Sequence, residues 1–191
     1  MSHRVGLDQA TVVEAAARLV DEECLEQLTL GRLAERLGVR TPSLYNHIEG
    51  LPGLKHELAL YCLRDLLDRI LRTTIGKSHA EAIFAFANAY RAYARETPGR
   101  YALTLQAPDP SDQELQAVAQ QLVDVLRAVL APYKLSEEEA IHAIRSLRSI
   151  VHGFSSLEVA GGFRMPVDLD ASFQWLINLF LAGLCRPTEK G

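Results

Sequence analysis

An excess of positive charge is the first thing that this sequence lacks. Its 191 residues include 20 lysines and arginines against 24 aspartates and glutamates, so the formal net charge is −4 at pH 7. The first 56 residues are no more basic, with six basic and eight acidic side chains. Composition therefore offers no electrostatic argument for a nucleic-acid partner, and any DNA-binding function has to rest on a motif.

Cysteines and long apolar runs are also scarce. Cys24, Cys62 and Cys185 are far apart and odd in number, so they fit neither a zinc site nor a disulfide framework, and idle thiols are favoured over a redox sensor. The sequence has no signal segment and no apolar run near the roughly 18 residues of a membrane span. We therefore expect a cytoplasmic protein with no membrane partner. No metal-ligand spacing such as His-Glu-x-x-His occurs, and we expect no metal, no cofactor and no catalytic residue.

Strand signals are missing as well, because no segment alternates polar and apolar residues between turn residues. Apolar residues recur instead at three- and four-residue spacing, broken by glycine and proline, which predicts an all-α fold of about nine helices. Three serines followed by a glutamate three residues later, at 78, 111 and 136, mark helix starts. The expected helices span residues 8–25, 30–37, 41–48, 50–74, 79–97, 100–106, 111–131, 136–161 and about 168–185.

Residues 28–48, LTLGRLAERLGVRTPSLYNHI, carry the most informative pattern. Two short helices are expected around a tight turn at Gly38, with Thr41 as the cap of the second and Pro42 in its first turn. The second helix has little to bury beyond Leu44 and Ile48, so it is better suited to present side chains than to fill a core. Its outward side offers hydrogen-bonding groups on a segment narrow enough for a DNA major groove.

Residues 8–60 resemble the N-terminal domain of the tetracycline-repressor (TetR) family, above all through LAERLGVRTPSLYNHI and the LKHELAL segment that follows. The resemblance implies a helix-turn-helix domain over residues 1–50 and an effector-binding and dimerisation domain over residues 51–191. The DNA contacts that it implies are Thr29, Arg40, Thr41, Pro42, Ser43, Tyr45, Asn46 and His47.

Two positions depart from the family pattern. The sequence reads Leu51-Pro52-Gly53 where a phosphate-gripping lysine is common, and Gly31 stands where an arginine is common. These departures predict a weaker non-specific affinity for DNA and a shallower dependence on salt.

The C-terminal two-thirds of the chain suggests two further surfaces. Residues 79–97 are apolar nearly all round, which fits the wall of an effector cavity and equally a plain core helix. The candidate effector contacts are Phe86, Tyr90, Tyr93, Tyr101 and His152, although His152 is by default a satisfied core histidine. The last two helices carry more apolar surface than one core face needs, which predicts a four-helix homodimer interface. Its candidate residues are Ile150, Phe154, Leu157, Phe173, Trp175, Leu176, Leu179 and Phe180.

The stretch from His152-Gly153-Phe154 to Gly161-Gly162-Phe163 also resembles a TetR subgroup with a Trp-His-Gly-type C-terminal domain, with Val151 in place of the tryptophan. The family's usual mode is a repressor that binds a palindromic operator as a dimer and is released by a small molecule. Two alternatives stay open. One is a helical enzyme, disfavoured because acid, base and metal groups do not converge, and the other is a small-molecule-binding or interaction module whose DNA binding has degenerated.

Overall fold

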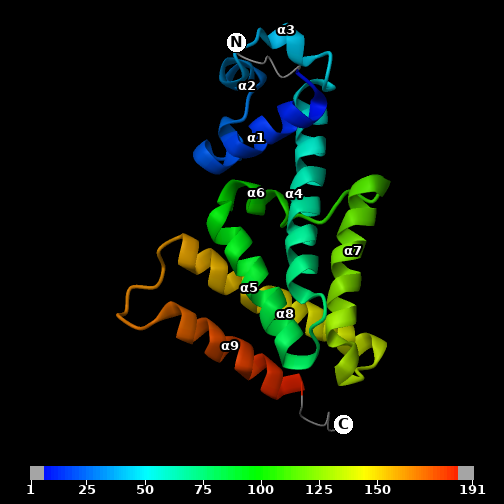
Figure 1. Ribbon diagram of the computed structural model, residues 1–191, viewed down its shortest axis with the longest axis vertical. Coiled ribbons are helices and arrows are strands. Elements are labelled where there is room, and N and C mark those ends of the chain that lie inside the picture. The colour runs from blue at the N-terminus through cyan, green and yellow to red at the C-terminus, as the bar shows by residue number, and fades with distance from the viewer. Residues whose placement is uncertain (1–6, 185–191) are drawn as a thin grey trace. The chain divides into compact units, whose positions relative to one another are not determined.

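The computed structural model describes residues 7–184, and all regular structure in that range is helical (Figure 1). Nine α-helices and two short 3-10 turns make up the described part of the chain, which contains no β-strand. This confirms the predicted fold class. The helices are α1 (Gln9–Glu23), α2 (Leu30–Leu37), α3 (Thr41–Leu44), α4 (Gly50–Thr74), α5 (His79–Glu96), α6 (Pro98–Leu103), α7 (Gln113–Leu130), α8 (Glu137–Val159) and α9 (Leu169–Leu184), with 3-10 turns at Leu25–Gln27 and Ala131–Tyr133.

Most predicted boundaries agree with the structure, and the clearest error concerns α3. This helix ends at Leu44 rather than at Ile48, and its N-cap is Arg40, which makes no side-chain capping bond, rather than Thr41. The chain continues past Leu44 in hydrogen-bonded turns, because the N–H groups of His47 and Ile48 both donate to the Leu44 carbonyl. The expected end of the last helix at Cys185 lies outside the described residues.

Helix ends are fixed by short polar side chains, though not always the expected ones. Ser136 and Glu139 form the predicted reciprocal capping box at the start of α8. The box predicted at Ser111 is wrong, because Asp112 accepts the N–H of Leu115 at 3.0 Å. Ser111 instead donates its hydroxyl to Asp109 at 2.6 Å. At residue 78 the serine hydroxyl contacts the ring of His79.

The helices form two compact units. The first takes the chain up to Asp65 together with Thr97–Val118, and we call it the reading unit because it contains the residues predicted from the sequence to contact DNA. In it α1 packs against α2 and α6, and α2 packs against α3. Its core is built from small and branched apolar side chains, with Val12, Leu33, Leu44, Leu54 and Leu58 fully buried.

The second unit takes Leu66–Glu96 and the chain from Ala119 onward, and we call it the sensor unit because it contains four of the five residues predicted from the sequence to contact an effector. Its central helix is α5, which contacts both α8 and α9, and these two lie side by side in Figure 1. The functional division predicted from the sequence, at residue 50, stays a prediction. None of the helices in the described range is long and apolar enough to cross a membrane.

Candidate nucleic-acid interface

The turn between α2 and α3 fixes the orientation of the short helix. Thr29 caps α2 by accepting the N–H of Arg32 at 3.3 Å. Gly38 ends α2 in the left-handed conformation, at φ 66°, which a glycine adopts without strain. Leu44 and Ile48 are both buried and point into the core of the reading unit. The turn at Gly38 and the burial of Leu44 and Ile48 therefore fix the backbone of residues 40–47 against the core.

The outward side of that segment carries the predicted DNA contacts. Arg40, Pro42 and Asn46 are exposed, and Tyr45 is 60% exposed although it is a large aromatic side chain. Thr41, Ser43 and His47 are half-buried beside them. Thr29 lies apart from this run, exposed at the start of α2. Seven of the eight predicted contacts thus occupy one continuous, accessible segment, with an amide, hydroxyl groups and a guanidinium among them.

The arginines of α2 are held by carboxylates from the end of α1, which the sequence did not reveal. Arg36 forms a two-pronged ion pair with Glu22, at 2.6 Å for both contacts. Hydrogen bonding to Arg36 lowers the pKa of Glu22. Arg32 pairs with Glu23 at 2.5 Å and donates to Gln27 at 2.8 Å. Among the described residues of the reading unit, the side chains of Arg40 and Lys55 form no ion pair within 4.0 Å. Few basic side chains are therefore free of carboxylate partners.

An acidic group also lies near the segment. Asp8 caps α1 by accepting the N–H of Thr11 at 2.7 Å. Hydrogen bonds from the side chain and backbone of Thr11 lower the pKa of Asp8, and the neighbouring ring of His47 lowers it slightly further. If the segment binds DNA as predicted, a carboxylate beside it opposes non-specific attraction to the phosphates.

A groove on the reading unit, lined by both charged and apolar side chains, was not foreseen either. It has a volume of about 520 Å³ and lies between α1 and α4, where its lining includes Glu14, Glu57, Tyr61 and Arg64. Arg64 pairs with Glu114 at 2.7 Å, and both side chains are exposed. No local sequence pattern could have located this groove, because its two walls are more than 40 residues apart in the chain.

The candidate effector contacts are divided between the two units. Phe86, Tyr90 and Tyr93 are buried on α5 of the sensor unit, where the rings of Phe86 and Tyr90 are 5.9 Å apart. His152 is half-buried on α8, with Nδ1 3.3 Å from the hydroxyl of Ser156. Tyr101 is also buried, but it belongs to α6 and therefore to the reading unit.

The candidate dimer residues separate into two groups. Phe154 and Phe173 are buried, with their rings 5.0 Å apart, so they fill the core of their own subunit. Trp175 is 66% exposed on α9, Leu179 is exposed four residues later on the same helix, and Leu157 is exposed on α8. Ile150, Leu176 and Phe180 are half-buried. Exposed large apolar side chains of this kind are common at surfaces that bind a partner.

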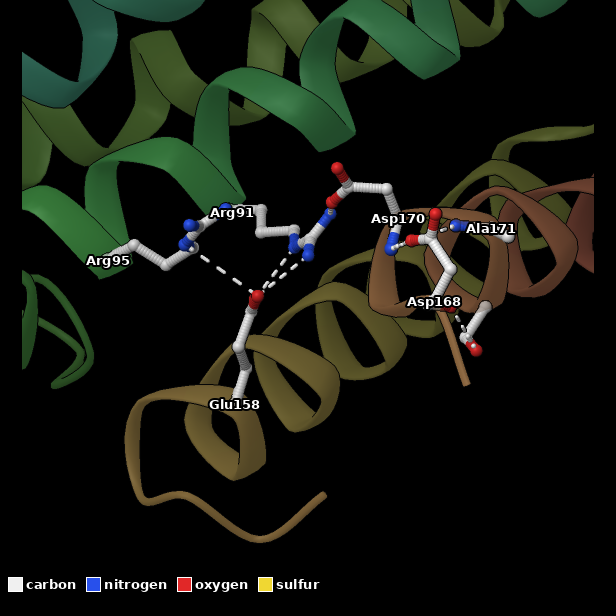
Figure 2. A network of polar contacts seen from close by, with 7 residues as sticks. Arg91, Arg95, Glu158, Asp168, Asp170 and Ala171 are labelled. Atoms are coloured by element: carbon white, nitrogen blue, oxygen red, sulfur yellow. Dashed lines mark hydrogen bonds and ion pairs between the residues drawn. The ribbon is translucent and has the colours of Figure 1, made fainter. Parts of the chain in front are cut away.

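A buried arginine on α5 ties the sensor unit together, as Figure 2 shows. Arg91 is 7% exposed and binds both oxygens of Glu158 on α8 at 2.7 Å and Asp170 on α9 at 2.8 Å. Its guanidinium also stacks over Phe154 and Phe173, at 5.2 and 4.8 Å. Hydrogen bonding to Glu158, and then to Asp170, raises the pKa of Arg91. The description of α5 as apolar nearly all round missed this group.

Comparisons with known proteins agree with this architecture. Residues 83–180 match the family described as Tetracyclin repressor-like, C-terminal domain. The chain is 37% identical over 185 residues to the uncharacterized HTH-type transcriptional regulator YobS of Bacillus subtilis, covering 96% of both chains. It is 33% identical over 186 residues to an uncharacterized HTH-type transcriptional regulator of Mycobacterium tuberculosis, covering 97% of this chain and 85% of the relative.

Solved structures share the fold. A protein of unknown function from Rhodococcus sp. RHA1 superposes with a TM-score of 0.80 at 20% identity, covering 97% of this chain and 100% of that one. A tetracycline-repressor variant from Acinetobacter baumannii AYE, solved in complex with minocycline, gives a TM-score of 0.67 at 24% identity, over 93% and 96% of the two chains. With a matching C-terminal domain and full-length relatives above 30% identity, the chain belongs to the TetR family of helix-turn-helix transcriptional regulators.

Proposed function

We propose that the protein is a ligand-responsive repressor that binds a palindromic operator as a homodimer and is released by a small molecule. The observation that carries the proposal is the segment 40–47, whose exposed polar side chains stand on a backbone fixed by the buried Leu44 and Ile48. In a major groove, a guanidinium such as that of Arg40 reads guanine and an amide such as that of Asn46 reads adenine. A regulator of this kind acts on the chromosome, so we expect it in the cytoplasm.

Homodimerisation through α8 and α9 would account for the exposed apolar face of Leu157, Trp175 and Leu179. A two-fold axis repeats the reading segment once per subunit. Two copies spaced roughly 34–36 Å apart would meet successive major grooves on one side of the DNA. The operator is therefore expected to be an inverted repeat.

Alanine at both Trp175 and Leu179 is expected to convert the dimer to monomer at micromolar concentration. Both side chains are half or more exposed in a single subunit, so their removal costs the subunit little, whereas buried aromatic anchors dominate interface energies. Sedimentation velocity measures the change. Met165→Ala is the matched control, because Met165 is an even more exposed apolar residue outside α8 and α9. A double variant that stays dimeric would place the interface elsewhere.

Salt dependence is expected to be shallow for a DNA-binding dimer. The arginines of α2 are engaged with Glu22 and Glu23, which leaves few cations for phosphates. With about two phosphate contacts per subunit, the plot of log affinity against log salt should have a slope of about −4. Fluorescence anisotropy between about 50 and 200 mM salt gives the slope, and a value steeper than about −7 would show that the α2 ion pairs open to grip DNA.

The effector is proposed to bind in the sensor unit, with α5 as one wall and Phe86, Tyr90, Tyr93 and His152 as candidate contacts. The aromatic and alanine-rich surface of α5 supports an apolar or amphipathic molecule. The Acinetobacter repressor solved with minocycline is a precedent for a small-molecule complex on this fold. By linkage, an effector that favours a conformation with a different head spacing weakens operator binding by the same factor as the operator weakens effector binding.

Selection from random double-stranded DNA by the purified full-length protein tests the proposal. The expected product is an inverted repeat with half-sites about one helical turn apart. Selection is repeated after unfolding and refolding, which removes a co-purified effector. Enrichment only after refolding would identify an effector carried through purification. No enrichment in either selection would favour the alternative function, a small-molecule-binding or interaction module with degenerate DNA binding.

A further inference from the structure

Arg100, in the first turn of α6, makes polar contacts with two other helices of the reading unit. Its backbone N–H donates to Oδ1 of Asp21 at 2.9 Å, and its side-chain Nε donates to Oδ2 of the same carboxylate at 2.6 Å. Its Nη1 donates to Oδ2 of Asp65 at 2.9 Å. Asp21 belongs to α1 and Asp65 to α4. One arginine on α6 therefore binds two different helices of the reading unit.

The three side chains are largely shielded from water. The side chain of Arg100 is 17% exposed, and those of Asp21 and Asp65 are 15% and 25% exposed. Ion pairs in such surroundings are screened much less than exposed ones. Because Asp21 accepts from the backbone and the side chain of the same residue, the pair fixes the direction of α6 as well as its distance from α1.

The backbone of α6 also lies directly on the last turns of α1. A Cβ atom on Gly99 would fall 1.9 Å from the carbonyl oxygen of Val20, so no other residue fits there without a backbone shift. Leu103, one turn further along α6, packs against the same core as α1 and α2. Gly99, Arg100 and Leu103 thus attach α6 to α1 through three independent contacts.

We propose that Arg100 is a positioning residue for DNA reading, acting through Asp21 and Asp65 without touching DNA. The contacts run from α6 to α1, from α1 to α2 and from α2 to α3. By binding both α1 and α4, Arg100 keeps the segment 40–47 in one orientation. Base recognition requires a fixed orientation, whereas contacts to phosphates alone do not. The inference rests on the proposed function, because it assigns a role in operator binding.

An arginine suits this role better than a lysine would. The guanidinium presents separate donors in a fixed plane, so Nε and Nη1 reach two carboxylates at once. A lysine ammonium at this position keeps the positive charge but lacks the separate, coplanar donors that reach two carboxylates at once. Arg100→Lys is therefore expected to restore part of what Arg100→Met removes.

The first test compares two affinities for each variant: that for the selected operator and that for a random-sequence duplex. Arg100→Met is expected to lower the operator affinity about tenfold and to leave the random-duplex affinity within about twofold, because only the orientation of the reading segment changes. Asp21→Asn should give a similar loss, and the double variant should lose little more than either single one. Arg64→Met is the matched control, since Arg64 precedes Asp65 on α4 and its ion pair is exposed.

The second test is hydrogen exchange of the full chain without DNA. Arg100→Met should speed exchange of the last amides of α1, where the N–H of Cys24 bonds to Val20, and leave those of α5 and α8 unchanged. Equal losses of operator and random-duplex affinity would overturn positioning, since they indicate unfolding or a lost phosphate contact. Positioning would also be overturned if Arg100→Met changed neither the hydrogen exchange of α1 nor the operator affinity. If the wild type binds no DNA, the proposed function fails by itself, and unchanged exchange at α1 would still overturn the positioning of α1 by Arg100.

Discussion

Alanine at Ser43, Tyr45 and Asn46 together is expected to lower operator affinity about a hundredfold or more, while the free energy of unfolding changes by less than about 1 kcal/mol. The loss follows because good base contacts are each worth about 1–3 kcal/mol. Stability is preserved because Tyr45 and Asn46 are exposed and Ser43 is half-buried, and exposed side chains contribute little to the core. Fluorescence anisotropy with the selected operator measures the affinity, and urea denaturation measures the free energy of unfolding.

Two controls separate reading from folding. Gln113→Ala with Gln121→Ala removes exposed polar side chains from α7. This control should change neither the operator affinity nor the free energy of unfolding. Leu44→Ala removes a fully buried side chain from the inward side of α3 and should cost about 2–5 kcal/mol of stability as well as operator binding. An operator affinity unchanged in the triple variant would show that another surface reads the DNA.

The second large effect is expected in the sensor unit. Glu158→Ala should lower the free energy of unfolding by about 3 kcal/mol, because removing one partner of a buried pair leaves the other charge uncompensated. Asp170 would remain beside Arg91, but its side chain is mostly exposed and replaces only part of the interaction. Thermal and urea denaturation both measure the loss.

The same measurements on two further variants show whether the burial of the charge is the cause. Glu138→Ala removes an exposed glutamate of the same helix, 3.7 Å from His142, and should change stability by no more than about 0.5 kcal/mol. Arg91→Met combined with Glu158→Met removes both charges and should cost less than Glu158→Ala alone. A double replacement that costs as much stability as Glu158→Ala, or more, would rule out this explanation.

Local structure was predictable from the sequence because its signals are local. The bounds of α4 at Gly50 and Thr74 follow from glycine and proline punctuation and from helical periodicity. Capping by Ser136 was predicted correctly because its hydroxyl accepts the N–H of Glu139 while the Glu139 carboxylate accepts the N–H of Ser136. At Ser111 the same pattern failed, because Asp109 and Asp112 offer stronger acceptors on either side.

Tertiary pairings were not predictable from the same signals. Arg91 and Glu158 are 67 residues apart, and Arg100 and Asp21 are 79 apart, so no periodicity relates them. Periodicity also shows that Phe154, Phe173 and Trp175 are apolar positions on helices without showing which side meets the subunit's own core. In the structure Phe154 and Phe173 are buried against Arg91, and Trp175 is exposed.

The ratio of operator affinity to random-duplex affinity, measured for the full-length protein at about 150 mM salt, tests the central claim most directly. A regulator that reads bases through the segment 40–47 should prefer its selected operator by a factor of at least about 1,000. A ratio near one would contradict the account, because the exposed side chains of that segment would then serve some purpose other than recognising a DNA sequence.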